Sequence, residues 1–157
     1  MGSRIGEWII QLLATPGYEL ATRVGVLGDS DDRTGGPLTS PAWMDTYNDE
    51  VVRFFFNHPT LEPSITLGNE TLVASALRQV GLDFEEPPTP EIVDSIFQGS
   101  GRRRKGEFAY ALAEEIDVVL DAGAVPAVPA HIVALFDYLV PTEPTEPDTA
   151  DDPITSD

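Results

Sequence analysis

The sequence predicts an α/β fold in which a partial parallel sheet is flanked by helices. Residues 22–28 form a short apolar run without polar alternation, which is typical of a parallel strand buried on both faces. Residues 50–57 form a second run of β-branched and aromatic side chains. Stretches with apolar residues at helical spacing precede and follow these runs. Because two strands are too few for a parallel sheet that stands alone, we expect the chain to lack the first strand or strands of its fold.

The first expected helix spans residues 4–14, and the Pro and Gly of "TPGYE" end it. We expect Trp8, with Trp43 and the run 54–56, to lie in the core rather than to stack against nucleic-acid bases. The reason is that no basic residue except Arg53 lies among these aromatics. The apolar residues at helical spacing are Ile5, Trp8, Ile9, Leu12 and Leu13.

Each expected strand leads into a polar loop. "TRVGVLG" (22–28) is followed by "DSDDRTGGPLTSP", whose Asp, Ser, Gly and Pro residues are typical of turns. "EVVRFFFN" (50–57) is bounded by "NHP". The carboxyl ends of both strands therefore carry polar side chains.

The rest of the foldable chain reads as helical. Helical patterns cover residues 64–82, 89–99, 104–123 and 128–140. Thr89 is a suitable N-cap with Pro90 in the first turn, and Gly99 ends that helix. We find no internal repeat and no domain boundary before Pro141.

Charge restricts what the protein can bind. Against nine Lys and Arg stand 27 Asp and Glu, which gives a formal net charge of −18. Residues 141–157 alternate Pro, Thr and acids, so we expect a disordered acidic tail there. The remainder is still strongly acidic and repels phosphate backbones over most of its surface. Any contact with nucleic acid must therefore be local, bridged by metal, or supplied by a partner.

Other classes are disfavoured by composition. The chain has no Cys, so it forms neither disulfides nor a thiolate zinc site. No apolar run reaches membrane-spanning length, and the N-terminus lacks a signal-peptide pattern. We therefore expect a soluble cytoplasmic protein without a membrane partner.

The end of the first strand is the first candidate site. In open α/β sheets, ligands bind beyond the carboxyl ends of the strands, and Asp29 and Asp31 form a D-x-D at that position. Two such carboxylates suit Mg²⁺ or Mn²⁺, with waters and substrate phosphates completing the shell. The alternative is that Asp29 to Asp32 simply start a polar turn.

Two further segments contribute candidates. Glu62 follows the second strand in "NHPTLE" and could reach the same metal centre, or it could belong to the N-terminal cap of the next helix at Thr60 or Ser64. The run Arg102 to Lys105 precedes a helix that we expect to begin near Gly106. It could stabilise charge on a phosphate, or be a solvated basic turn that balances neighbouring acids.

Three segments together carry a resemblance to a known family. "VLGDSDD", "FFFNHPTLE" and "KGEFAYALAEEI" are similar, in this order, to the TOPRIM domain of the OLD-family (overcoming lysogenization defect) ATP-dependent endonucleases. The closing "VPAHIVALFDYL" also resembles the family's last helix after a V-P. The likeness covers roughly residues 5–140 and implies a partial Rossmann-like TOPRIM domain over residues 1–140.

The resemblance implies two-metal cleavage of DNA. Asp29 and Asp31 would bind Mg²⁺ or Mn²⁺, and Glu62 would help to bind the second ion. Lys105 would act beside the scissile phosphate as a catalytic residue, together with Asp29 and Glu62. DNA would contact the metal site and the basic run of Arg102, Arg103, Arg104 and Lys105.

The chain also departs from that family. TOPRIM domains begin with a strand that ends in a glutamate, and Glu7 in "IGEWII" lies on a helix instead. No G-x-x-x-x-G-K phosphate loop of an ATPase is present either. The resemblance therefore covers only the C-terminal part of the domain, and an ATPase domain or partner chain would supply the missing strand.

Three functional interpretations stay open. The chain is a nuclease subunit completed by another polypeptide, or a truncated TOPRIM-like binding module without catalysis. In the third interpretation the chain is a phosphotransfer or phosphatase domain that uses the D-x-D with Ser64 and Lys105.

The two histidines are expected to have structural positions. We expect His58 to be a turn residue, with a position next to the metal as the alternative, and His131 to be a surface residue.

Overall fold

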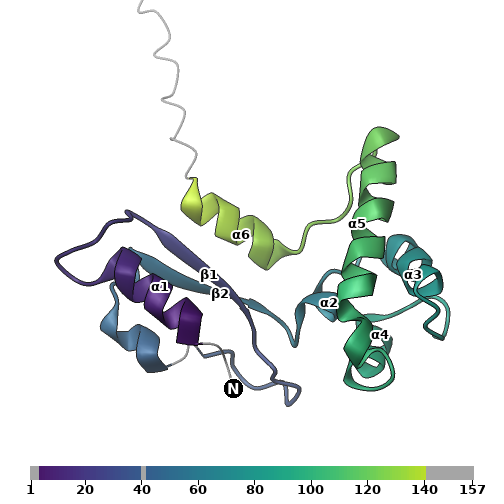
Figure 1. The fold of residues 1–157 in the computed structure, drawn as a ribbon, viewed down its shortest axis with the longest axis horizontal. Helices are drawn as coiled ribbons and strands as arrows, with labels where there is room; N and C mark the ends of the chain where they lie inside the picture. The colour runs from purple at the N-terminus through teal and green to yellow at the C-terminus, as the bar shows by residue number, and fades with distance from the viewer. Residues whose placement is uncertain (1–3, 40–41, 141–157) are drawn as a thin grey trace, which may run out of the picture.

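The computed structural model describes residues 4–39 and 42–140 and has a mixed α/β fold that is mostly helical (Figure 1). The expected acidic tail, residues 141–157, lies outside the described residues. The elements in chain order are α1 (Arg4–Ala14), β1 (Val24–Asp29), the 3₁₀ helix η1 (Ala42–Thr46), β2 (Val52–Asn57), α2 (Leu61–Ser64), α3 (Glu70–Gln79), α4 (Pro90–Gln98), the 3₁₀ helix η2 (Arg102–Arg104), α5 (Lys105–Asp121) and α6 (Ala130–Leu139).

The two strands pair in parallel, as the sequence predicts. Val24 lies opposite Val52 and Asp29 lies opposite Asn57, so both strands end at the same level. The expectation that β1 is buried on both faces is wrong, because its residues are half-buried or exposed. Within the described part of the chain β1 has a single hydrogen-bonded neighbour, and Gly25 contributes no side chain to either layer.

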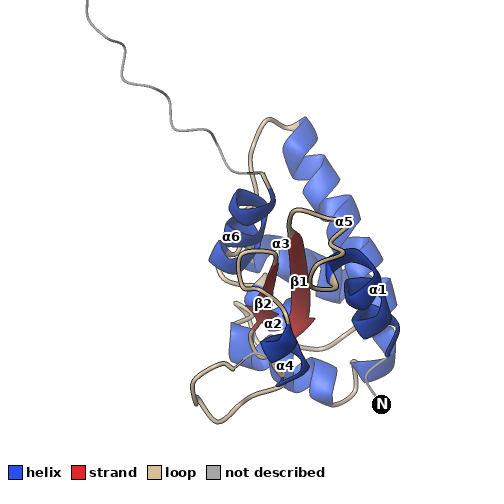
Figure 2. Cartoon of the chain, turned by 90° about the vertical axis from the view of Figure 1, so that its left-hand side faces the viewer, coloured by secondary structure: helices blue, strands red, loops and turns tan. Residues whose placement is uncertain are grey.

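Helices cover both faces of this small sheet (Figure 2). On one face, Ile10 and Ala14 of α1 pack with Val52. On the other face, the ring of Phe55 lies 5.9 Å from that of Tyr138 in α6. Leu135 of α6 approaches β1 so closely that a Cβ on Gly25 would overlap its Cδ1. A side chain at position 25 would therefore require Leu135 to move.

The helices α3, α4 and α5 build a separate hydrophobic core. Val73, Leu77 and Val93 are fully buried there, and Phe97 and Phe108 pack with ring centroids 4.9 Å apart. The ten buried members of this helical core are Val73, Ala76, Leu77, Val80, Leu82, Val93, Phe97, Phe108, Ala111 and Leu112.

The expected helix over residues 64–82 is interrupted. Gly68 has a φ of +80°, a left-handed conformation that glycine adopts without steric cost. Beside it, Asn69 Nδ2 donates to the Ile65 carbonyl oxygen at 2.9 Å, and α3 begins only at Glu70. Leu67, on the expected apolar face, is therefore 73% exposed.

The aromatic residues divide between core and surface. Phe55 is buried and Trp43 packs against the core beside the sheet, as expected. Trp8 is 62% exposed, so its expected burial is wrong. The reason is that α1 turns Ile10 and Ala14 to the strands, which leaves Trp8 on another side of the helix.

In residues 4–39 and 42–140, none of the helices combines the length and the apolar character that crossing a bilayer requires.

Candidate functional site at the strand ends

Polar side chains from three elements join at the ends of the strands. Asn57, the last residue of β2, donates from Nδ2 to Asp29 Oδ1 at 3.0 Å. Its Oδ1 lies 2.8 Å from Nε2 of His131, in the first turn of α6. Since a carboxylate only accepts, the amide orientation is fixed and Nε2 of His131 donates. Asp29, Asn57 and His131 therefore form one hydrogen-bonded chain.

His131 is not the surface residue that the sequence predicts. It is half-buried and holds a side-chain partner 74 residues away in sequence. Burial lowers the pKa of His131 below its ordinary value of 6.5, because desolvation disfavours the imidazolium. Near neutral pH the ring is therefore neutral, with its proton on Nε2.

The D-x-D loop is tied to the segment that follows β2. Ser30 N donates to the Asn57 carbonyl oxygen and Asp31 N to the Pro59 carbonyl oxygen, both at 3.0 Å. Asp31 has a φ of +53°, a left-handed conformation that aspartate tolerates better than most residues. Ser30 Oγ also lies 3.0 Å from Nδ1 of His58. Asp29 thus ends the strand itself, and Asp31 belongs to a backbone-anchored turn.

Glu62 and Lys105 meet although 43 residues separate them. Lys105 Nζ lies 3.0 Å from Glu62 Oε2, which also accepts a hydrogen bond of 2.9 Å from Thr60 Oγ1. The Glu62 side chain is 13% exposed and that of Lys105 is 38% exposed. Thr60 is the N-cap of α2, yet its side chain makes no capping hydrogen bond to the backbone. Two residues that the family resemblance singles out therefore form an ion pair.

A second ion pair links the D-x-D loop to α4, and sequence reasoning missed it. Arg33 Nε and Nη2 each lie 2.8 Å from an Asp94 carboxylate oxygen. Arg33 Nη1 also donates to the Asp31 carbonyl oxygen at 3.3 Å. The Arg33 guanidinium, and more weakly Lys105, lowers the pKa of Asp94. The two residues are 61 positions apart, and no local sequence pattern predicts a contact over that separation. Only the folded structure shows this ion pair.

The donor chemistry at the D-x-D suits a hard divalent cation. Asp29 and Asp31 are both exposed and offer carboxylate oxygens, and Mg²⁺ is commonly held by one or two carboxylates plus water. Across residues 4–39 and 42–140, however, no three or more His, Cys, Asp or Glu side chains form a group that could hold a metal ion. Glu62 is thus not grouped with the two aspartates, and its Oε2 is engaged by Lys105.

The basic run divides into paired and solvent-exposed cations. Helix α5 begins at Lys105, one residue before the expected start. Arg104 Nη2 pairs with Glu107 at 2.7 Å, as the basic-turn alternative predicts for one acid. Arg102 and Arg103 are exposed and line a surface groove of about 500 Å³ with Gly99 and Ser100. These two arginines offer positive charge to an anion approaching this loop.

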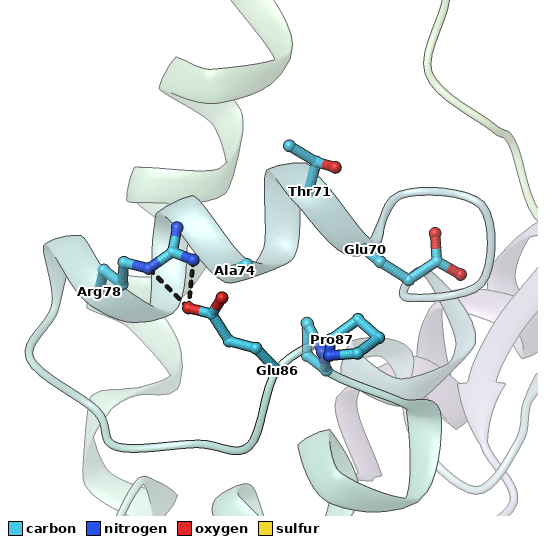
Figure 3. Close-up of a pocket in the computed structure, with 7 residues that line it drawn as sticks. Glu70, Thr71, Ala74, Arg78, Glu86 and Pro87 are labelled. Carbon is cyan, nitrogen blue, oxygen red and sulfur yellow. Dashed lines mark hydrogen bonds and ion pairs between the residues drawn. The ribbon is translucent and has the colours of Figure 1, made fainter.

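Another groove, between α3 and residues 86–88, carries no comparable chemistry (Figure 3). It has a volume of about 420 Å³, and an ion pair between Arg78 and Glu86 spans it. The Arg78 guanidinium also lies 5.6 Å from the centroid of the Phe84 ring. The positive charge of Arg78 is thus engaged by Glu86 and Phe84, so we do not place the functional site in this groove.

Comparison with known proteins adds no name to this site. Neither protein-family models, nor curated proteins, nor solved structures give a match to the chain.

Proposed function

We propose that the chain carries the C-terminal part of a metal-dependent endonuclease domain that hydrolyses phosphodiester bonds of DNA. The observation that supports this most is the contact between Lys105 and Glu62, since both belong to the segments that resemble the OLD-family TOPRIM domain. Their proximity is what a shared phosphodiester site requires, and neither residue was expected to meet the other from spacing alone. The partner that supplies a missing strand, such as an ATPase, is part of the proposal.

In this proposal each residue at the strand ends has its own role in cleavage. Asp29 and Asp31 would hold Mg²⁺ or Mn²⁺, which would supply charge stabilisation for the phosphate and an activated water. Asn57 orients Asp29 by occupying its Oδ1. Lys105 would leave Glu62 when a phosphate arrives and neutralise that phosphate, with Arg102 and Arg103 attracting the strand at the nearby loop.

A specific observation favours a second candidate, a TOPRIM-like binding module without catalysis. Lys105 and Glu62 neutralise each other, and one oxygen of Asp29 is already engaged by Asn57. An arrangement in which the candidate groups satisfy one another can serve as a structural linkage between α2 and α5. The two candidates differ in whether these residues matter for cleavage or only for folding.

Nicking of supercoiled plasmid DNA with Mn²⁺ or Mg²⁺ distinguishes these candidates. We expect nicking by the native chain to fall by about a hundredfold or more in Asp29→Ala, Glu62→Ala and Lys105→Ala. The matched control is Asp83→Ala, because Asp83 is an exposed acid outside the site and its loss should leave nicking unchanged.

Calorimetry with Mn²⁺ supplies the second measurement. The proposal expects metal affinity to weaken sharply in Asp29→Ala and to persist in Asp83→Ala. If the folded native chain does not nick DNA, alone or with its partner, the binding module is favoured. Equal metal affinity in native protein and Asp29→Ala would remove the metal site altogether.

A further inference from the structure

An apolar groove lies on the helical half of the molecule. It has a volume of about 320 Å³ and is bounded by α3, α5 and residues 125–129. Along α5 its wall is formed by Leu112, Ile116 and Leu120, spaced four residues apart on one side of the helix. Leu112 is 6% exposed and Leu120 is 49% exposed, so the groove opens toward the C-terminal end of α5.

The opposite wall is held in place by a single asparagine. Asn69 Nδ2 donates to the Ala127 carbonyl oxygen at 2.7 Å, and its Oδ1 accepts from Ala127 N at 2.9 Å. These bonds fix the segment that carries Val125 and Val128, which are 81% and 54% exposed. The polar atoms of Asn69 are thereby engaged, which leaves a groove surface that is almost entirely apolar. Helix α6 does not cover it, because α6 packs against β1 and β2 (Figure 1).

The charge around the groove is of one sign. Residues 106–140 contain no Lys or Arg and carry six acids. On α5, Asp117 and Asp121 directly follow the groove residues Ile116 and Leu120, and both aspartates are exposed. An occupant with Lys or Arg beside its apolar face would therefore be attracted, and an acidic one repelled. A second copy of this chain, at −18, is disfavoured for that reason.

We propose that this groove binds an amphipathic helix of a partner protein, with apolar anchor residues in the groove and basic residues beside Asp117 and Asp121. The mode is a helix laid into a hydrophobic groove, with anchors at i, i+3, i+4 and i+7. The opposite charges set the orientation and accelerate association. The groove is lined by none of the candidate site residues, and its proposed role does not depend on the proposed nuclease function.

The test uses the full chain and a synthetic helical peptide of about 18 residues, with Leu on one face and Lys at the positions that flank this face. Leu120→Lys and Val128→Lys place a cation in the groove, and both positions are exposed enough to tolerate it. The matched control is Val118→Lys, which adds the same charge to α5 at a residue that is 65% exposed and does not line the groove. Circular dichroism checks that each variant is folded.

We expect fluorescence anisotropy to show peptide affinity falling about tenfold or more in Leu120→Lys and Val128→Lys, and less than about threefold in Val118→Lys. A peptide with Glu in place of Lys should bind at least about tenfold more weakly. Equal losses in Val118→Lys and Leu120→Lys, or equal binding of a Lys/Ser peptide without an apolar face, would overturn the proposal. Binding to phosphatidylcholine vesicles that Leu120→Lys abolishes, without peptide binding, would identify a membrane surface and also overturn it.

Discussion

The helical half of the molecule and the half built on the sheet differ in how completely they bury their apolar residues. Among the side chains that the structure describes, ten are buried in the helical core, and Val73, Leu77 and Val93 are 0% exposed. In the same set the core beside the sheet has four, and Trp8 and Leu12 of its helix α1 are 62% and 67% exposed. Three helices can enclose a core on every side, whereas a two-stranded sheet leaves edges and flanks open.

The two halves also differ in where the buried core and the candidate functional residues lie. The polar chain from Asp29 through Asn57 to His131 lies at the strand ends. Lys105 and Asp94 of the helical half pair instead with Glu62 and Arg33, which lie on the segments that follow the strands. Most of the buried apolar side chains therefore lie in the helical half, and the candidate polar groups lie at the strand ends.

The largest expected effect compares one aromatic residue from each half. Phe108→Ala removes a side chain that is 1% exposed and packs on Phe97, so it should cost about 3–5 kcal/mol of unfolding free energy. Trp8→Ala removes a larger side chain that is 62% exposed and should cost less than about 1 kcal/mol. Chemical denaturation measures both. Similar costs for the two variants would break the comparison, because α1 would then be buried in solution.

The next effect concerns glycine on the sheet half. Gly25→Ala would make its Cβ overlap Cδ1 of Leu135, so the Leu135 side chain must leave its packed position, at a cost of about 1–3 kcal/mol. The matched change Gly6→Ala in α1 meets no atom within 4 Å and should stabilise the protein by about 0.5–1 kcal/mol. Thermal unfolding should therefore shift in opposite directions. Two shifts of the same sign would show that α6 does not pack on Gly25.

A smaller, pH-dependent effect tests the ion pair that joins the halves. The pKa of Asp94 is lowered from 3.8, so its contribution to stability is present above pH 3.8 and is lost as the pH falls through the lower folded value. Asp94→Asn should flatten the decline in stability that the native chain shows as the pH falls below about 3.8. Asp83→Asn, at an exposed loop position, serves as the control. An unchanged acid limb in Asp94→Asn would mean that the Arg33 contact does not persist in solution.

The smallest effect is a shift in one titration. NMR should find the pKa of His131 below 6.5 and, at neutral pH, the proton on Nε2. Asn57→Leu removes the acceptor of that proton and should raise the fraction of the Nδ1 tautomer. An Nδ1-protonated ring in the native chain would contradict the hydrogen-bonded chain at the strand ends.

Local patterns made much of the fold predictable. The helix over residues 4–14, the Thr89 cap with Pro90, and the two strands follow from spacing and turn residues that lie within a few positions of one another. Thr89 Oγ1 accepts from Ile92 N, as an N-cap does. These features depend on neighbouring residues, which is why a single sequence suffices.

The sequence does not predict the contacts between distant residues, the local break at Gly68, the exposure of Trp8 or the incomplete burial of β1. The residues around His131 do not predict its contact with Asn57, and those around Asp94 do not predict its contact with Arg33. Each contact forms only because the fold brings two distant elements together. For Glu62 and Lys105, the family resemblance named the residues, but the structure supplies the 3.0 Å contact between them. Whether these groups bind metal or DNA stays a prediction.

The absence of Lys and Arg from residues 106–140 has a practical consequence for finding a partner. Trypsin has no cleavage site within residues 106–140, so α5 without its first residue, the groove segment and α6 stay together in one long peptide. Amine-reactive crosslinkers have no lysine to modify on this surface. A carbodiimide, which couples the partner's lysines directly to Asp117 or Asp121, is therefore the reagent suited to trapping a helix seated on it.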